Sequence, residues 1–160
     1  MRKITRPLFA SIGVLIAAGG VFLFSKTVTV LSVRNLDHPR SFYFRVAPPE
    51  QVSLFYTSSM YNAPVEEVFE VGHGEIILKT VRTDSPAVME YYGFEGTGPV
   101  QALRKNLGPA FSIQASVSQD QRITVGQSTL DMHTIARGGD RILVSVDRVS
   151  LAGYLWRIVF

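Results

Sequence analysis

The sequence predicts a mainly β protein, in which a single antiparallel β-sandwich or barrel-like domain with one short helix follows one N-terminal transmembrane helix. Three observations predict this class. Residues 8–24 form an apolar stretch without a charge, and residues 27–160 contain many short β-rich runs separated by turn residues. Hydrophobic residues make up 46% of the chain and charged ones 18%, which is enough to build a core. The chain has no cysteine, so a disulfide framework, a thiol nucleophile and a zinc–thiolate site are excluded.

The N-terminal stretch predicts a membrane anchor at residues 8–24 behind a basic cytoplasmic tail at residues 1–7. As a helix it would be about 25 Å long, which is close to the thickness of a hydrocarbon core. A cleaved signal peptide is the alternative, but its best small-residue site, at residues 18–20, would split the apolar stretch. Arg2, Lys3 and Arg6 should hold the N-terminus inside the cell. We therefore expect a single-pass protein of the cytoplasmic membrane with an extracytoplasmic domain, which is periplasmic if the host has an outer membrane.

The rest of the chain, residues 27–160, reads as one β domain. The runs 52–57, 65–71 and 75–83 should form a meander, and the two residues 126–127 should close a tight hairpin. The one helix expected starts at Pro99, because Val100, Leu103 and Leu107 would share a face and Gly108–Pro109 would end it. All the expected strands lie at residues 27–34, 41–46, 52–57, 65–71, 75–83, 111–117, 122–125, 128–132, 141–147 and 154–160.

The distribution of charge argues against nucleic-acid binding. The chain has 16 Lys and Arg against 13 Asp and Glu, a net charge of +3. Three of the basic residues lie within the first six positions, so 13 basic residues remain against 13 acidic ones from residue 26 onward. Because the β domain is neutral, it lacks the basic surface that a phosphate backbone requires.

The most informative stretch is residues 56–69, where a carboxylate falls on the apolar face of an expected strand. Strand alternation places Glu67 with Val65 and Phe69, whereas Glu66 faces solvent. A buried carboxylate must be paired, hydrogen-bonded or protonated. Its expected partners are a distant arginine or four hydroxyl donors across the hairpin: Tyr56, Ser58, Ser59 and Tyr61. Such a cluster is either a pocket for a small ligand or a partner's main chain, or a structural network that fixes the hairpin, and both interpretations stay open.

Other candidate residues carry weaker signals. Tyr91 and Tyr92 stand beside a glycine-rich loop and could line a pocket, an interface or the core. The apolar C-terminal residues 154, 156, 158 and 160 read as a core strand or as a surface facing the bilayer or another membrane protein. No histidine stands at a spacing that pairs it with Ser58 or Ser59, and the three histidines have no metal-ligand spacing. We therefore predict no catalytic residues, no metal and no cofactor.

The chain resembles an uncharacterised family of membrane-anchored exported proteins encoded beside TAXI-type TRAP transporters. The resemblance spans residues 28–150 and rests on the pattern F-x-Y-x-x-S-x-x-x-x-P-V-E-E-V-F, matched here by Leu54, Tyr56, Ser59 and residues 64–69. Family members often carry a histidine before the motif serine, where this chain has Ser58. The resemblance implies a non-enzymatic accessory protein that contacts the TRAP permease or its solute-binding protein, and this is the leading hypothesis. The alternative is a small-ligand-binding module with a polar pocket around Glu67.

Overall fold

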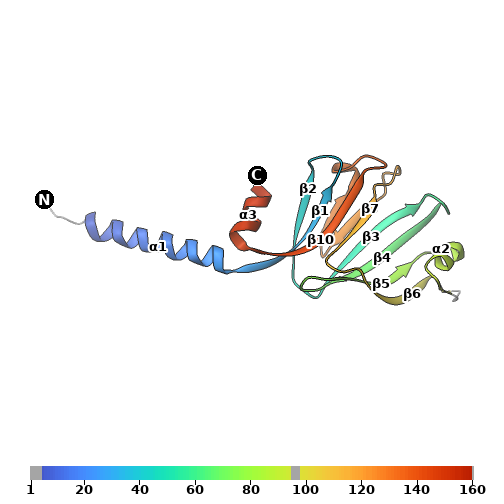
Figure 1. The fold of residues 1–160 in the computed structure, drawn as a ribbon, viewed down its shortest axis with the longest axis horizontal. Coiled ribbons are helices and arrows are strands. Elements are labelled where there is room, and N and C mark those ends of the chain that lie inside the picture. The colour runs from blue at the N-terminus through green and yellow to red at the C-terminus, as the bar shows by residue number, and fades with distance from the viewer. Residues whose placement is uncertain (1–4, 95–97, 160) are drawn as a thin grey trace. The chain divides into compact units, whose positions relative to one another are not determined.

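The computed structural model describes residues 5–94 and 98–159, except for the side chains of residues 5–11, 13, 14 and 16. The chain divides into two compact units. One unit, the β domain, comprises Thr29–Asp147, and the other, the terminal unit, combines Met1–Val28 with Arg148–Phe160. The fold is mainly β, as the sequence predicted, and it contains two antiparallel sheets and three short α-helices, where the sequence analysis expected one short helix after a transmembrane helix (Figure 1).

The β domain is built from a four-stranded and a six-stranded sheet (Figure 1). The four-stranded sheet has the order β2 (Ser41–Val46), β1 (Thr27–Asn35), β10 (Arg141–Ser150), β7 (Ala110–Gln114). The six-stranded sheet has the order β6 (Val100–Asn106), β5 (Ile76–Arg82), β4 (Ala63–Val71), β3 (Glu50–Ser58), β8 (Arg122–Val125), β9 (Ser128–Asp131).

One hydrophobic core contains side chains from both sheets. Leu31, Ile142 and Val144 of the four-stranded sheet belong to the same buried cluster as Leu54 and Ile123 of the six-stranded sheet. The rings of Phe69 and Phe111 stack with centroids 5.1 Å apart, which joins β4 to β7. Burial of such side chains supplies most of the stability of a domain of this size.

Most of the expected strands form within a few residues of their predicted bounds. Residues 41–46 and 122–125 are strands as predicted, and β3, β4 and β5 form the expected meander. Val125 pairs with Ser128, so residues 126–127 close the predicted hairpin, and Gly126 there has a φ of 56° that favours glycine. The expected strand 111–117 ends early, at Gln114, and the chain after it forms a loop.

The helix predicted to start at Pro99 is wrong, because this segment forms the edge strand β6. Val100 pairs with Arg82 and Asn106 with Ile77, so the segment takes the free edge of β5. Leu103 still packs against the core, and Gly108, with a φ of 75°, belongs to the turn between β6 and β7. The spacing of three apolar residues therefore fitted a helix by coincidence, and sheet pairing decided the structure.

A helix that the sequence analysis missed, α2 (Pro86–Tyr91), precedes this strand. Ser85 is its N-cap, accepting a hydrogen bond from the backbone N–H of Val88, and Pro86 occupies the first helical turn. Buried Val88 and Met89 hold the helix on the core.

The strand predicted at 154–160 is also wrong, because residues Leu151–Val159 form the helix α3 and Phe160 lies outside the described residues. β10 runs on to Ser150, whose side chain accepts a hydrogen bond from the backbone N–H of Gly153, a bond typical of a helix N-cap. The alternating apolar residues of this segment therefore do not form a core strand, and none of the nine helix residues is buried.

The terminal unit consists of α1 (Thr5–Ser25), α3 and the adjoining strand ends. α1 and α3 contact one another, and the backbone N–H of Leu151 donates to the carbonyl of Lys26 at 2.7 Å. No helix within the described part of the chain is long and apolar enough to span a membrane. Much of the predicted anchor at residues 8–24 lies outside the residues whose side chains are described.

Candidate functional site

A cavity of about 670 Å³ opens in the β domain beside the β3–β4 hairpin. Its walls come from this hairpin and its turn, from α2 and from the chain that continues past β7. We call it the tyrosine cavity, because the four tyrosines Tyr56, Tyr61, Tyr91 and Tyr92 line it. Its volume lies within the range of small-molecule sites, about 300–1,000 Å³.

The seven residues that the sequence analysis singled out for binding all line the tyrosine cavity. They come from three elements. β3 and β4 pair on either side of their turn, and the end of α2 supplies the remaining residues. Whether these residues bind a ligand stays a prediction. The seven are Tyr56 on β3, Ser58, Ser59 and Tyr61 at the hairpin turn, Glu67 on β4, and Tyr91 and Tyr92 at the end of α2.

Strand register determines the position of Glu67. It lies opposite Leu54 on one side and Val81 on the other, both buried, so its side chain projects toward the core. Glu66 faces the opposite side and pairs with Arg82, with a 3.0 Å distance between Oε2 and Nη1. The two adjacent glutamates therefore lie in different environments, as strand alternation requires.

Glu67, Tyr92 and Tyr56 form a hydrogen-bonded triad on the cavity wall. The Tyr92 hydroxyl donates to Oε1 of Glu67. The Tyr56 hydroxyl lies 3.0 Å from the Tyr92 hydroxyl and 3.5 Å from the same carboxylate oxygen. Of the partners expected for Glu67, Tyr56 is present, whereas Ser58, Ser59 and Tyr61 line the cavity without bonding the carboxylate. The sequence analysis treated Tyr92 as part of a separate aromatic cluster and so missed its bond to Glu67.

The environment of the triad shifts all three pKa values upward. Burial raises the pKa of the Glu67 carboxyl, and the hydroxyls of Tyr92 and Tyr56 offset part of this rise by hydrogen bonding to the charged form. Burial and the charge of Glu67 raise the pKa of Tyr56 to about 12. The pKa of Tyr92 is raised by the same causes. Both hydroxyls therefore keep their protons at physiological pH and act as donors.

The carboxylate of Glu67 lines the tyrosine cavity. Oε1 receives the tyrosine hydroxyls, but Oε2 has no hydrogen-bond partner among the described residues. A carboxylate oxygen can accept a further hydrogen bond, so Glu67 keeps acceptor capacity for a group inside the cavity.

Another wall is the loop after β7, of which the sequence analysis assigned residues 115–117 to a strand. Gln121, which is buried, holds this loop: its side chain accepts from the backbone N–H of Ser116 and donates to the carbonyl of Gln114. Asp120 accepts from the hydroxyls of Thr57 and Ser118, which joins the loop to β3. These hydrogen bonds lower the pKa of Asp120. Only the clustering of serine, glutamine and aspartate at residues 116–121 signals this role in the sequence.

The aromatic residues at the end of α2 divide between the core and the cavity. Tyr92 stacks on Phe94 with centroids 6.4 Å apart, and Phe94 packs against the core. Tyr91 meets Tyr92 edge to face at 5.8 Å and is 72% exposed. Both expectations for this cluster, core packing and pocket lining, therefore describe part of it.

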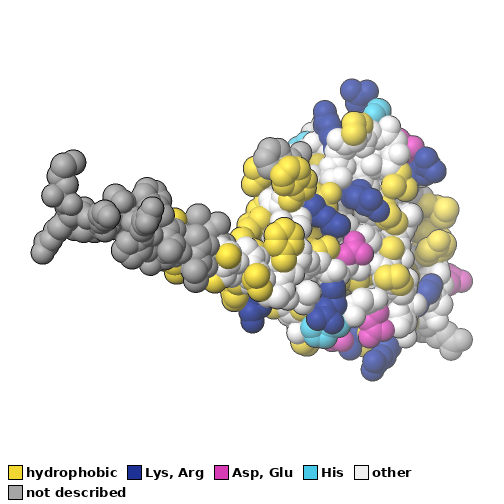
Figure 2. Space-filling model, turned by 60° about the vertical axis from the view of Figure 1, so that its left-hand side comes forward, with side chains coloured by type: hydrophobic (Ala, Val, Ile, Leu, Met, Phe, Trp, Pro, Cys, Tyr) yellow, Lys and Arg dark blue, Asp and Glu magenta, His cyan; other side chains and the backbone are white. Residues whose placement is uncertain are grey.

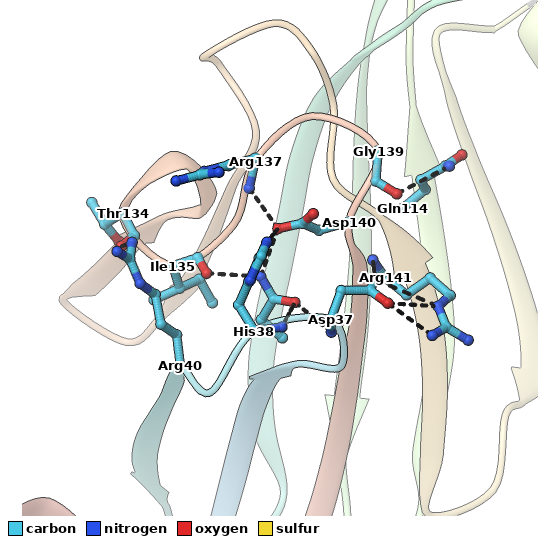
Figure 3. Close-up of polar contacts among 11 residues, drawn as sticks. Asp37, His38, Arg40, Gln114, Thr134, Ile135, Arg137, Gly139, Asp140 and Arg141 are labelled. Atoms are coloured by element: carbon cyan, nitrogen blue, oxygen red, sulfur yellow. Dashed lines mark hydrogen bonds and ion pairs between the residues drawn. The ribbon is translucent and has the colours of Figure 1, made fainter.

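A second polar cluster centres on Asn35 at one end of the four-stranded sheet (Figure 3). The Asn35 amide donates to the carbonyl of Ile135 and to Asp140, and its oxygen accepts from the backbone N–H groups of Asp37 and His38. Asp37 in turn bonds the backbone and the guanidinium of Arg141. Each polar group here is held by a neighbouring loop, so the Asn35 cluster is a structural network that joins the β1–β2 turn to the chain before β10.

The described residues that line the tyrosine cavity include no histidine, and His38 instead lies 3.8 Å from Asp140 in the Asn35 cluster. Within the described residues no group of three or more His, Asp or Glu side chains is placed to hold a metal ion. Comparisons with protein-family models, with curated proteins and with solved structures give no match for this chain.

Proposed function

We propose that the β domain is a non-enzymatic binding module, which takes a small ligand into the tyrosine cavity. The observation that carries this proposal is the half-buried carboxylate of Glu67, which lines a cavity of about 670 Å³ and accepts the hydroxyls of Tyr92 and Tyr56 through Oε1 alone among the described residues. A purely structural network uses all of its strong acceptors internally, whereas a binding site leaves one directed at the space the ligand fills.

The composition of the wall supports binding rather than catalysis. Ser58 and Ser59 lie beside the cavity, but its described lining offers no histidine or lysine that could activate a hydroxyl. Glu67 is committed to two tyrosines with raised pKa values, and its sequence neighbour Glu66 points away from it. We expect no labelling of either serine by a serine-directed phosphonate.

A thermal-shift screen tests the binding proposal. A library of amines, amino acids, sugars, carboxylates and nucleosides should contain compounds that raise the Tm of the protein through mass action. Glu67→Gln should abolish the shift because it alters the accessible acceptor, whereas the matched variant Glu66→Gln, on the outer side of the same strand, should keep it. A library without a single stabilising compound would contradict the proposal.

A second proposal concerns where the binding module acts: it is a membrane-anchored accessory of a TRAP-type transporter, with its β-sandwich outside the cytoplasmic membrane. The terminal unit supports it. Leu15, Phe22 and Phe24 of α1 and Trp156 of α3 are exposed, with Trp156 at 65%, and such side chains suit a bilayer and its interface. Basic and acidic side chains both occur on the face of the β domain that Figure 2 shows, and residues 29–147 contain 10 basic and 13 acidic residues.

Fractionation and pull-down test the anchored role. The full chain should stay in the membrane pellet after a carbonate wash, and a C-terminal reporter should be active only outside the cytoplasm. Purification in mild detergent should recover a TRAP permease or its solute-binding protein. A freely soluble protein, or one recovered without any membrane partner, would contradict this second proposal and leave the ligand-binding proposal standing.

A further inference from the structure

The charge of the tyrosine cavity comes from a single side chain. Among the described residues that line it, Glu67 alone carries a formal charge, and none is a lysine, arginine or histidine. The positive charge of Lys105 on β6 lowers the pKa of Glu67, but Lys105 does not line the cavity. The cavity therefore offers one acidic group without a cation to neutralise it.

The remaining polar groups of the triad are arranged to support a negative Glu67. Tyr92 and Tyr56 both direct hydroxyls at Oε1, which stabilises the ionised carboxylate and fixes its orientation. Oε2 accepts no hydrogen bond from another described residue, so it can accept one from a ligand. A ligand group that fits this atom is a donor, and a positively charged donor gains most.

The apolar part of the wall suits the same kind of ligand. Besides the four tyrosine rings, the apolar side chains of Leu54, Met60, Val88 and Ile113 line the cavity. Tyrosine rings attract cations through the negative potential of their faces, and aliphatic side chains bury the hydrocarbon part of a ligand. A carboxylate surrounded by aromatic rings is the environment in which ammonium groups bind.

We propose that the tyrosine cavity selects small organic cations: a primary amine or ammonium compound whose nitrogen bonds Oε2 of Glu67 and whose hydrocarbon part packs on the tyrosine rings. This inference rests on the proposed binding function and adds the ligand class to it. An organic anion would be repelled by Glu67 and would find no basic side chain on the described wall. A neutral alcohol would donate to Oε2 without the gain from opposite charges.

The affinity of the cavity for a cation depends on the proton of Glu67. Burial raises the pKa of this carboxyl, so mild acid protonates it more readily than an exposed glutamate. A protonated Glu67 must release its proton before it can pair with an ammonium group. Tyr56 and Tyr92, which bond this carboxylate, have raised pKa values and stay protonated over this range. Affinity for an amine should therefore fall as the pH is lowered from 7.5 to 5, whereas a carboxylate ligand would gain from the protonated form.

Three probes of one shape test the inference: benzylamine, benzyl alcohol and benzoate, titrated into the full-length protein by calorimetry at pH 7.5 and pH 5. Benzylamine should bind about tenfold or more tightly than the other two at pH 7.5, as expected for one added ion pair and cation–π contact. Glu67→Gln should bring benzylamine down to the level of benzyl alcohol. Glu66→Gln should leave all three affinities unchanged, because Glu66 pairs with Arg82 on the outer face of the strand and does not line the cavity.

The outcomes separate this inference from the binding proposal. Equal or tighter binding of benzoate at pH 7.5, or a preference for benzylamine that survives Glu67→Gln, overturns the cation selectivity while a binding cavity remains. If none of the probes and no compound of the thermal-shift library binds, the binding proposal itself fails. A Glu67→Gln variant that keeps the Tm of the unliganded protein shows that lost affinity does not come from unfolding.

Discussion

Tyr92→Phe removes one hydroxyl, and the structure predicts a large effect for so small a change. The hydroxyl donates to Oε1 of Glu67 and lies 3.0 Å from the hydroxyl of Tyr56. A hydrogen bond to a charged group contributes about 1.5–3 kcal/mol, and the half-buried carboxylate would keep only the 3.5 Å contact with Tyr56. We expect a loss of about 2 kcal/mol in the free energy of unfolding at pH 7.5, which lowers Tm by roughly 8 °C at about 4 °C per kcal/mol.

The neighbouring tyrosine provides the matched control. Tyr91→Phe makes the same chemical change on a side chain that is 72% exposed, and we expect it to alter stability by less than about 0.5 kcal/mol. Urea denaturation at pH 7.5 and pH 5 measures both variants. The cost of Tyr92→Phe should shrink as the pH is lowered, because a Glu67 carboxyl that gains a proton accepts a weaker hydrogen bond. Equal stability losses for the two variants at pH 7.5 would refute the triad as a stabilising unit.

Three further predictions concern stability. Glu67→Leu should lower Tm more than Glu66→Leu in thermal denaturation, because it leaves the hydroxyl of Tyr92 without its acceptor, at a cost of about 1–3 kcal/mol; equal Tm values would contradict a role for Glu67 in the network. Asn35→Ala breaks four hydrogen bonds of a buried amide and should cost about 2–4 kcal/mol in urea denaturation, so a loss below about 1 kcal/mol would argue against the Asn35 cluster as a structural joint. Hydrogen bonds lower the pKa of Asp120, so its contribution to the free energy of unfolding is present above the pKa of an unfolded aspartate and is lost as the pH falls through the folded pKa. Asp120→Asn should therefore flatten this part of the acid-unfolding curve, and an unchanged curve would contradict a stabilising role for Asp120.

Strand positions could be predicted from the sequence because alternation is a local signal. The run Val65–Phe69 shows which residues face the core, and the register with β3 and β5 places Glu67 between Leu54 and Val81 as alternation required. Turn residues also indicated where strands end. Asn62, which ends the β3–β4 turn, has a φ of 48°, a value that asparagine tolerates better than most residues.

The errors arose where distant pairing decides the structure. Nothing local to Val100, Leu103 and Leu107 shows that β5 has a free edge for them to join. By contrast, Ser85 caps α2 and Ser150 accepts a hydrogen bond in the first turn of α3, so both serines are local signals for these helices. The bond between Tyr92 and Glu67 joins residues 25 positions apart across a helix and a sheet, so only the fold reveals it.

The order of the four-stranded sheet places the first and last strands side by side, since β1 and β10 are neighbours at its centre. Lys26, just before β1, and Leu151, just after β10, are joined by a backbone hydrogen bond. Tension applied between the two chain ends would therefore separate these strands one bond at a time, as a zipper opens, instead of shearing all bonds together. Such a domain resists little force when pulled by both ends.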